Sequence, residues 1–188
     1  MSSGAASLLA GACQVRRASA GDRPALERML ARCTGETRYR RFHGYVNVFP
    51  ERYLAEALSG SSLHFALVAY VAGVDGTVIG DTVAGDTVAG GTVVALASCR
   101  AVFEGVAELG VLVEDAWQRR GVGARLAREI LGYASQTGLR ALQAQVLGDQ
   151  SWIVGVLRRY GPCEVVAARG TLTVTLTLPR SLGGERCA

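Results

Sequence analysis

The stretch from Gln118 to Ala124 combines the residue types and spacing of a phosphate-binding turn. It follows an apolar run that ends at Val113 and precedes a run with helical spacing, so a strand-to-helix corner is predicted there. The first amides of a helix lack internal partners and carry partial positive charge, and Gly121 and Gly123 let a phosphate reach the main chain without meeting a Cβ. Charge-assisted hydrogen bonds are expected from three nearby arginines, Arg119, Arg120 and Arg125. The corner therefore predicts a site for a diphosphate.

Other phosphate-binding loops do not match this chain. The sequence contains no GxxxxGK[ST] motif and no lysine at all, which excludes a P-loop nucleotide hydrolase of the usual form. GxGxxG is also absent, which argues against a dinucleotide-binding fold. The pattern QxxGxG is only moderately specific, and its place between a strand and an amphipathic helix gives it weight.

The elements that must position this corner follow from the periodicity of the chain. Apolar runs predict seven strands, over residues 14–19, 63–71, 93–102, 106–113, 141–147, 164–168 and 171–178. Helices are predicted from Asp22 to a stop at Gly35, over 50–58, from Gly121 to a stop at Gly138, and from a cap at Asp149 to Gly161. This order predicts an α/β (α+β) fold, in which helices cover both faces of a mixed sheet of about seven strands.

A repeat with a period of five separates the second and third predicted strands: Thr77 to Asp81, Thr82 to Asp86 and Thr87 to Gly91. Three Gly-rich copies are too few for a solenoid, so the repeat is interpreted as a hairpin loop lengthened by duplication, over residues 74–92. A functional lid is the alternative.

Length and composition indicate a single domain. The chain has 188 residues, 49% of them apolar, which is enough for one core. Residues 13–180 are assigned to that domain, with a disordered leader at 1–12 and a flexible tail at 181–188. No uninterrupted apolar run approaches the roughly 18 residues of a membrane span, so no membrane contact is expected.

Charge and cysteine usage narrow the choice of partners. All 20 basic residues are arginine and the net charge is +4, but the basic residues are spread along the chain, so no nucleic-acid partner is expected. The 5 cysteines include no CxxC pair, and with only 2 histidines they predict neither a metal site nor a disulfide framework. A reducing cytoplasm is the expected location.

These motifs resemble those of a known family. Gln118-Arg-Arg-Gly-Val-Gly123 resembles the Q/RxxGxG/A signature of the GNAT acyltransferases, and the predicted order of elements is similar to that fold. More narrowly, residues 107–113 and 117–123, together with the segment from Thr37 to Phe42, resemble the Pat-type bacterial protein lysine acetyltransferases. The resemblance implies acetyl-CoA as co-substrate and transfer of its acetyl group to a protein lysine. A small-molecule amine is one alternative acceptor, and a non-catalytic acyl-CoA-binding regulatory module is a different kind of function.

The same resemblance assigns residues to the co-substrate. The loop amides are expected to bind the pyrophosphate of coenzyme A. The strand before the loop is expected to line the pantetheine arm, where two central parallel strands splay apart. The residues expected at coenzyme A are Leu112, Val113, Gln118, Arg119, Arg120, Gly121, Val122, Gly123, Ala124 and Arg125.

In the Pat-type enzymes, a glutamate at the position of Glu108 is the proposed general base. A lysine ε-amine has a pKa of about 10.4, so its deprotonation at pH 7 costs about 4.6 kcal/mol, and a positioned carboxylate can accept the proton. A solvated edge position for Glu108, and Glu104 as the base, are the alternatives. Glu114 and Asp115 are expected to cap a helix or to face solvent.

The acceptor side is expected in the Arg- and aromatic-rich segment 36–45. The candidate substrate residues there are Arg38, Tyr39, Arg41, Phe42 and His43, which suit equally well a role in covering the sheet. Many family members place a tyrosine four residues before the glycine that ends the helix after the second motif strand, where it acts as general acid. Leu157 stands at that position, and Tyr160 is expected to face the core, so solvent is expected to reprotonate the thiolate.

Overall fold

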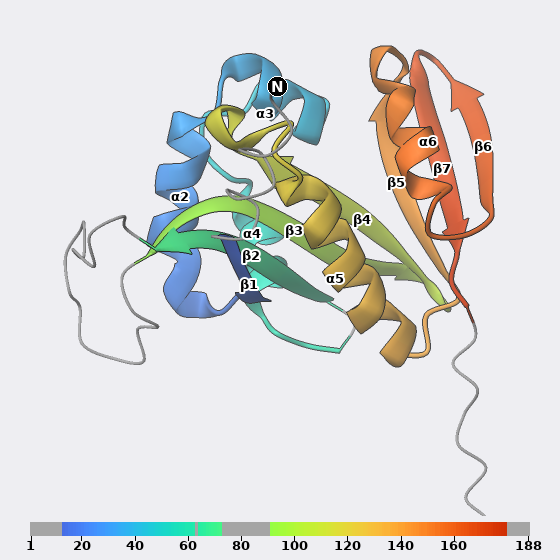
Figure 1. Ribbon diagram of the computed structural model, residues 1–188, viewed down its shortest axis with the longest axis horizontal. Helices are drawn as coiled ribbons and strands as arrows, with labels where there is room; N and C mark the ends of the chain where they lie inside the picture. The colour runs from blue at the N-terminus through green and yellow to red at the C-terminus, as the bar shows by residue number, and fades with distance from the viewer. Residues whose placement is uncertain (1–12, 63, 73–90, 180–188) are drawn as a thin grey trace, which may run out of the picture.

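The computed structural model describes residues 13–62, 64–72 and 91–179 (Figure 1). The predicted leader, the predicted tail and residues 74–90 of the predicted repeat loop lie outside these ranges. Gly91 and Thr92, expected at the end of that loop, belong to a strand.

Seven strands form one sheet in the order β1-β2-β3-β4-β5-β7-β6 (Figure 1). They are β1 (Cys13–Arg17), β2 (His64–Ala72), β3 (Gly91–Phe103), β4 (Val106–Val113), β5 (Ala141–Leu147), β6 (Cys163–Ala168) and β7 (Thr171–Thr177). Every neighbouring pair is antiparallel except β4 and β5, which are parallel. The predicted mixed sheet of an α/β (α+β) fold is confirmed.

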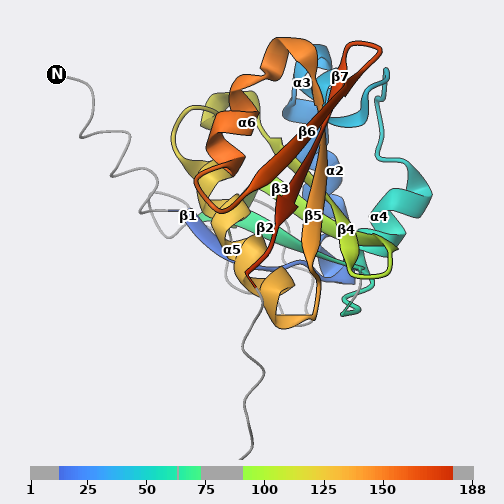
Figure 2. The same ribbon diagram turned by 90° about the vertical axis from the view of Figure 1, so that its right-hand side faces the viewer.

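Helices cover both faces of this sheet. They are α2 (Arg23–Arg32), α3 (Gly35–Phe42), α4 (Glu51–Leu58), α5 (Val122–Gln136) and α6 (Trp152–Leu157), with short 3-10 turns η1 (Ala20–Asp22), η2 (Asp115–Trp117) and η3 (Gly148–Gln150). The buried side chains of α5 and α6 belong to one apolar cluster, and those of α2 and α4 to a second cluster on the opposite face (Figure 2). No helix within the described ranges is both long and apolar enough to cross a membrane.

The apolar spacing seen in the sequence matches the burial. The centre of β3 is buried on both faces, which accounts for its unbroken apolar run: Val94 and Ala97 belong to the cluster with α5, whereas Val93 and Leu96 belong to the cluster with α2 and α4. Helix α5 buries Val122, Leu126 and Ile130 on one side, as the predicted helical period requires.

Helix α3 is a feature that the sequence does not predict. Its segment has no apolar stripe, and Gly35, expected to end the preceding helix, begins α3 because α2 already ends at Arg32. Thr34 supplies the cap, since its side chain accepts a hydrogen bond from the main-chain N–H of Thr37 at 3.2 Å.

The helix after β5 also differs from its predicted bounds. Asp149, expected to cap it, lies within η3 instead. Helix α6 starts at Trp152 and spans only 6 residues, so it ends before the predicted stop at Gly161.

Candidate active site

The candidate site begins where two parallel strands separate. Strands β4 and β5 pair only through residues 106–108 and 141–143. Beyond these pairs β4 stays with β3 as far as Val113, while β5 stays with β7 as far as Leu147, so the two strands diverge (Figure 1). The main chain of residues 109–113 therefore has no strand partner on the β5 side, which is the expected splay.

A cavity of about 830 Å³ lies at this splay. Its walls come from the facing parts of β4 and β5, from α3 and α4, and from the start of α5 and of α6. The residues expected at coenzyme A that line it are Leu112, Val113, Gln118, Arg119, Gly121, Gly123 and Ala124. The candidate base and acceptor residues that line it are Glu108, Arg41, Phe42 and His43.

The corner between η2 and α5 has a conformation suited to an anion. Arg119 (φ 56°) and Gly121 (φ 82°) both have left-handed main-chain conformations, and Gly121 immediately precedes α5. The N–H of Arg125 donates to the carbonyl of Gly121 at 3.0 Å, and this is the first bond of the helix. The N–H groups of residues 122–124 therefore have no partner inside the helix and lie at its positive end. This arrangement fits a diphosphate.

The side chain of Gln118 braces this corner. Its Nε2 donates to the main-chain oxygen of Val113 and to Oγ1 of Thr37 on α3, both at 3.0 Å. The glutamine of the motif therefore ties the loop to the strand before it and to a distant helix, so its amide nitrogen is already committed within the protein.

Three other residues expected at coenzyme A do not line the cavity. The guanidinium of Arg120 lies over the ring of Trp117, 5.4 Å from its centroid. Val122 is buried in the core, and Arg125 donates to the main-chain oxygen of Cys13 on β1. Of the three arginines expected at coenzyme A, Arg119 is therefore the one that lines the cavity.

The two acidic residues after β4 each hold a helix in place, Asp115 the start of α3 and Glu114 the end of α2. Asp115 accepts hydrogen bonds from the N–H and Oγ1 of Thr34, both at 2.8 Å, and from Oγ1 of Thr37 at 2.7 Å. Burial raises the pKa of Asp115, but these hydrogen bonds outweigh it, and the pKa lies below its ordinary value. Glu114 was expected to cap a helix or to face solvent. It occupies the N-cap position of η2 without a side-chain cap hydrogen bond, and its side chain is buried and pairs with Arg32 at 2.8 Å.

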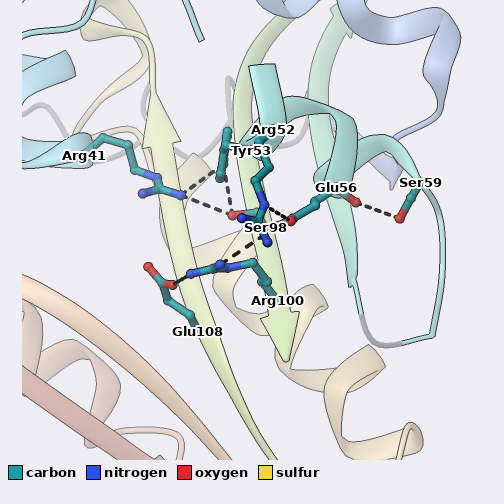
Figure 3. Close-up of polar contacts among 8 residues, drawn as sticks. All are labelled: Arg41, Arg52, Tyr53, Glu56, Ser59, Ser98, Arg100 and Glu108. Carbon is teal, nitrogen blue, oxygen red and sulfur yellow. Dashed lines mark hydrogen bonds and ion pairs between the residues drawn. The ribbon is translucent and has the colours of Figure 1, made fainter. Parts of the chain in front are cut away.

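Glu108 is the last residue of β4 that pairs with β5, so its side chain lies at the point where the splay opens. Its Oε2 accepts a hydrogen bond from Nη2 of Arg100 at 2.6 Å (Figure 3). Arg100 also lies 4.0 Å from Oε2 of Glu56. The other carboxylate oxygen of Glu56, Oε1, accepts a hydrogen bond from Arg52 at 2.8 Å. Glu104 is exposed and does not line the cavity, so the structure brings only one of the two candidate bases to the site.

A second polar cluster lies beside Glu108. Nη2 of Arg41 donates to the hydroxyl of Tyr53 at 3.0 Å and to Oγ of Ser98 at 3.2 Å, and the tyrosine hydroxyl donates to Ser98 at 3.0 Å (Figure 3). A Cβ added to Gly110 would collide with the Arg41 guanidinium, so glycine is needed there for the arginine to lie against β4.

The other acceptor candidates divide between the cavity and the surface. His43 ends α3 in a left-handed conformation (φ 52°) and lines the cavity. Arg38 and Tyr39 do not line it: Arg38 donates to Asn47 at 3.3 Å, and Tyr39 packs on the exposed Tyr45 at a centroid distance of 5.3 Å.

Helix α6 brings no acidic hydroxyl to the cavity. Leu157, at the position of the family's tyrosine, is buried and lines the cavity wall. Tyr160 packs against the core and donates its hydroxyl to the main-chain oxygen of Ala124 at 3.2 Å. Leucine has no proton to donate, and the hydroxyl of Tyr160 is engaged with the main chain of α5.

The cavity residues that the sequence analysis did not single out include Tyr53, Glu56, Ser98 and Arg100. The sequence pattern indicates two of them: Ser98 and Arg100 interrupt the apolar run of β3 two residues apart, so they share a face of the strand. It does not indicate Tyr53 or Glu56, because polar positions on an amphipathic helix are usual.

Comparison with known proteins agrees with this geometry. The family model described as Acetyltransferase (GNAT) family matches residues 35–161, which is more than half of the chain. The GNAT domain of S. lividans PAT superposes with a TM-score of 0.70 at 21% identity, over 88% of this chain and 90% of that one. A GCN5-related N-acetyltransferase from Kribbella flavida superposes with a TM-score of 0.61 at 21% identity, covering 88% and 96%.

A third solved structure contains the co-substrate. The acetyltransferase yncA from Salmonella typhimurium, with acetyl-CoA bound, has a TM-score of 0.61 at 19% identity and covers 94% of this chain and 99% of its own. A search among curated proteins finds no match. The matched residues span α3, the β4 splay and the corner before α5, and the chain therefore belongs to the GNAT family of acetyltransferases.

Proposed function

We propose that this acetyl-CoA-dependent N-acetyltransferase acts on a primary amine by direct attack, with Glu108 as the general base, and that the acceptor is a protein lysine. One observation carries the proposal: a splay lined by a single candidate base has a glycine-bearing helix start at its far end. About 17 Å of extended strand separates Glu108 from Val113. A thioester on a long arm suits this distance, because its diphosphate binds at the corner while its sulfur lies near the base.

The proposed chemistry needs a neutral amine beside the thioester. The carboxylate of Glu108 accepts a proton from the incoming ammonium, directly or through a water molecule. The amine nitrogen then bonds to the thioester carbon, and the carbon–sulfur bond breaks with its electron pair remaining on sulfur. The nitrogen loses a second proton as the amide forms, and solvent carries a proton to the thiolate. Main-chain N–H groups of residues 109–113, which have no strand partner on the β5 side, are suited to stabilise the oxyanion formed on the way.

The ion pair with Arg100 supports this role for Glu108. The glutamate side chain is 34% exposed, so it stays accessible to an acceptor while Arg100 holds its orientation. The same arginine lies between Glu108 and Glu56, which limits the rotamers that the base can adopt.

The acceptor is assigned from the resemblance of residues 107–123 and 37–42 to the Pat-type enzymes. Trp152 is 65% exposed and lines the cavity, an apolar position suited to contact a protein surface around the lysine. Cys13, Cys33, Cys99 and Cys163 are all unpaired, which supports a reducing, cytoplasmic location as part of the proposal.

The base is tested by Glu108→Gln. Turnover is expected to fall roughly 100- to 10,000-fold, while the Kd for acetyl-CoA measured by calorimetry stays unchanged, because the substitution removes the proton acceptor and leaves the corner intact. The matched control is Glu104→Gln, a change at an exposed carboxylate outside the cavity, which is expected to keep wild-type turnover. Wild-type turnover in Glu108→Gln would refute the assignment.

The acceptor is tested by acetyl-CoA consumption with lysine-containing proteins and with small amines. Preference for a protein lysine is the expected result. If only small amines are turned over, the protein-lysine acceptor is refuted and a small-molecule amine takes its place. The assignment of Glu108 as the base is not affected by that result.

A further inference from the structure

The guanidinium of Arg41 lies in the cavity without a counter-ion. Its hydrogen-bond partners are two neutral hydroxyls, those of Tyr53 and Ser98. Within the described ranges no carboxylate lies at ion-pair distance from Arg41, and its Nε is buried without a hydrogen-bond partner. Three other arginines of the cavity each pair with a carboxylate of the protein: Arg40, Arg52 and Arg100.

The fold fixes this arginine in place from four elements. The rings of Phe42 and Tyr53 each lie 5.0 Å from its Cζ, and Ser98 on β3 accepts its hydrogen bond. Gly110 on β4 leaves the room that the guanidinium occupies. A half-buried positive charge that contacts only neutral groups loses solvation free energy that an anion would restore. We therefore expect a ligand to supply the counter-ion of Arg41.

The position of Arg41 indicates which ligand supplies the anion. Ser98 of β3 pairs with Gly110 of β4, and Arg100 pairs with Glu108. Gly110 and Glu108 lie on the same face of β4 two residues apart, so about 7 Å of strand separates them. In the opposite direction along β4, Val113 lies about 10 Å from Gly110, and the corner proposed for the diphosphate lies beyond Val113. The guanidinium is therefore a neighbour of the base rather than of the diphosphate, and it lies on the face that carries α3 and α4.

We infer that Arg41 binds a carboxylate on the acceptor, close to the amine that is acetylated. Nη2 of Arg41 is already bonded to the two hydroxyls, whereas Nη1 has no hydrogen-bond partner among the described residues and can donate a charge-assisted hydrogen bond to such a group. The carboxylate has two possible sources, an amino acid acetylated on its own amine or an acidic residue next to an acceptor lysine. This inference rests on the proposed acetyl transfer. It adds that the acceptor carries a negative charge close to its reacting amine.

The test compares matched acceptors with the full chain and acetyl-CoA. One arm pairs amino acids with their amides, for example methionine with methioninamide. The other arm pairs lysine peptides that carry glutamate or glutamine next to the lysine. Wild type is expected to favour the carboxylate member roughly 10- to 100-fold in kcat/KM in one of the arms, and that arm identifies the source.

Arg41→Gln is expected to abolish this preference, because it raises KM for the carboxylate member far more than KM for its neutral partner. Gly110→Ala provides a second variant, because the added Cβ displaces the guanidinium without removing its charge, and it is expected to lose the same preference. Arg28→Gln, at an exposed arginine of α2 outside the cavity, is the control that keeps the preference. Calorimetry with acetyl-CoA checks that each variant is folded.

Three results would overturn the inference. Equal loss of kcat with both members of a pair in Arg41→Gln means that the arginine stabilises the oxyanion instead. Equal rates with both members in wild type mean that no carboxylate is recognised, although the acetyl transfer stands. A wild type that acetylates no amine in either arm overturns the proposed function as well, and the two failures are thereby distinguished.

Discussion

Asp115 shows how a single side chain links the site to the scaffold. Its carboxylate accepts hydrogen bonds from Thr34 and Thr37, and Thr37 in turn accepts one from Gln118 in the corner loop. One residue thereby connects the start of α3 with the loop assigned to the diphosphate. Single charged residues elsewhere in the site act similarly, since Arg100 joins β3 to Glu108 of β4 and approaches Glu56 of α4.

Asp115→Asn is expected to lower the free energy of unfolding by about 1–3 kcal/mol at pH 6, because hydrogen bonds to a charged acceptor are lost. The folded-state pKa of Asp115 lies below its ordinary value, so its stabilising contribution is complete above the unfolded-state pKa of about 3.9 and is lost as the pH falls through the folded-state pKa. Urea unfolding is therefore expected to show a difference from wild type at pH 6 that shrinks as the pH falls below about 3.9.

The control for that measurement is Asp149→Asn. This carboxylate is 61% exposed and lies 3.4 Å from Arg40, so its loss is expected to change stability by less than about 1 kcal/mol. A difference for Asp115→Asn that stays constant from pH 6 to pH 3 would contradict the assigned role of the carboxylate.

At the scale of elements, the corner before α5 depends on a left-handed glycine, which follows the left-handed Arg119 by two residues. Gly121 has φ 82°, and the helix begins directly after it. Any other residue at this position is strained, whereas the neighbouring Gly123 makes only ordinary contact distances to Val113 when a Cβ is added. The two glycines of the motif thus have different physical roles, one in the turn and one at the start of the helix.

Gly121→Ala is expected to cost roughly 1–2 kcal/mol of stability and to weaken acetyl-CoA binding, because strain at the turn moves the amides that face the diphosphate. Gly132→Ala is the matched control in the same helix: no atom lies within 4 Å of its added Cβ, and it is expected to stabilise by about 0.5–1 kcal/mol. Thermal unfolding and calorimetry measure both effects. Unchanged acetyl-CoA affinity in Gly121→Ala would argue against the corner as the diphosphate site.

At the scale of the whole molecule, the sheet consists of two parts with a short connection. Strands β1 to β4 form one part, and β5, β7 and β6 form the other. They are joined by the pairing of residues 106–108 with 141–143, and α5 packs across the first part while α6 covers the second (Figures 1 and 2). A ligand in the splay therefore contacts both parts at once.

Acetyl-CoA at 100 times its Kd is expected to raise the free energy of unfolding by about 2.7 kcal/mol, because it binds the folded chain alone. Hydrogen exchange is expected to slow in both facing stretches, residues 109–113 and 144–147. ADP, which has a diphosphate but no thioester arm, is expected to protect only the corner before α5. Protection by acetyl-CoA confined to one strand would contradict a ligand lying between the two.

Local sequence was sufficient to predict most of the fold and the strand-to-helix corner before α5. Both β4 and β5 have their predicted bounds, because an apolar run between turn residues specifies a strand without help from distant contacts. The corner was equally predictable, since its glycine spacing and the helix that follows are local features. Helix α3 was not, because its segment has no apolar stripe and its start is held by hydrogen bonds to Asp115, some 80 positions away in the chain.

Only the tertiary structure decided which side chains share the cavity. Periodicity could not separate Arg41, which faces Gly110, from Arg38 on the surface, because both belong to one arginine-rich segment of α3. Nor could it place Arg125 beside Cys13, since that contact joins a helix and a strand far apart in sequence. Spacing along the chain sets the direction of a side chain within its own element, whereas the partner that it meets depends on how the elements pack.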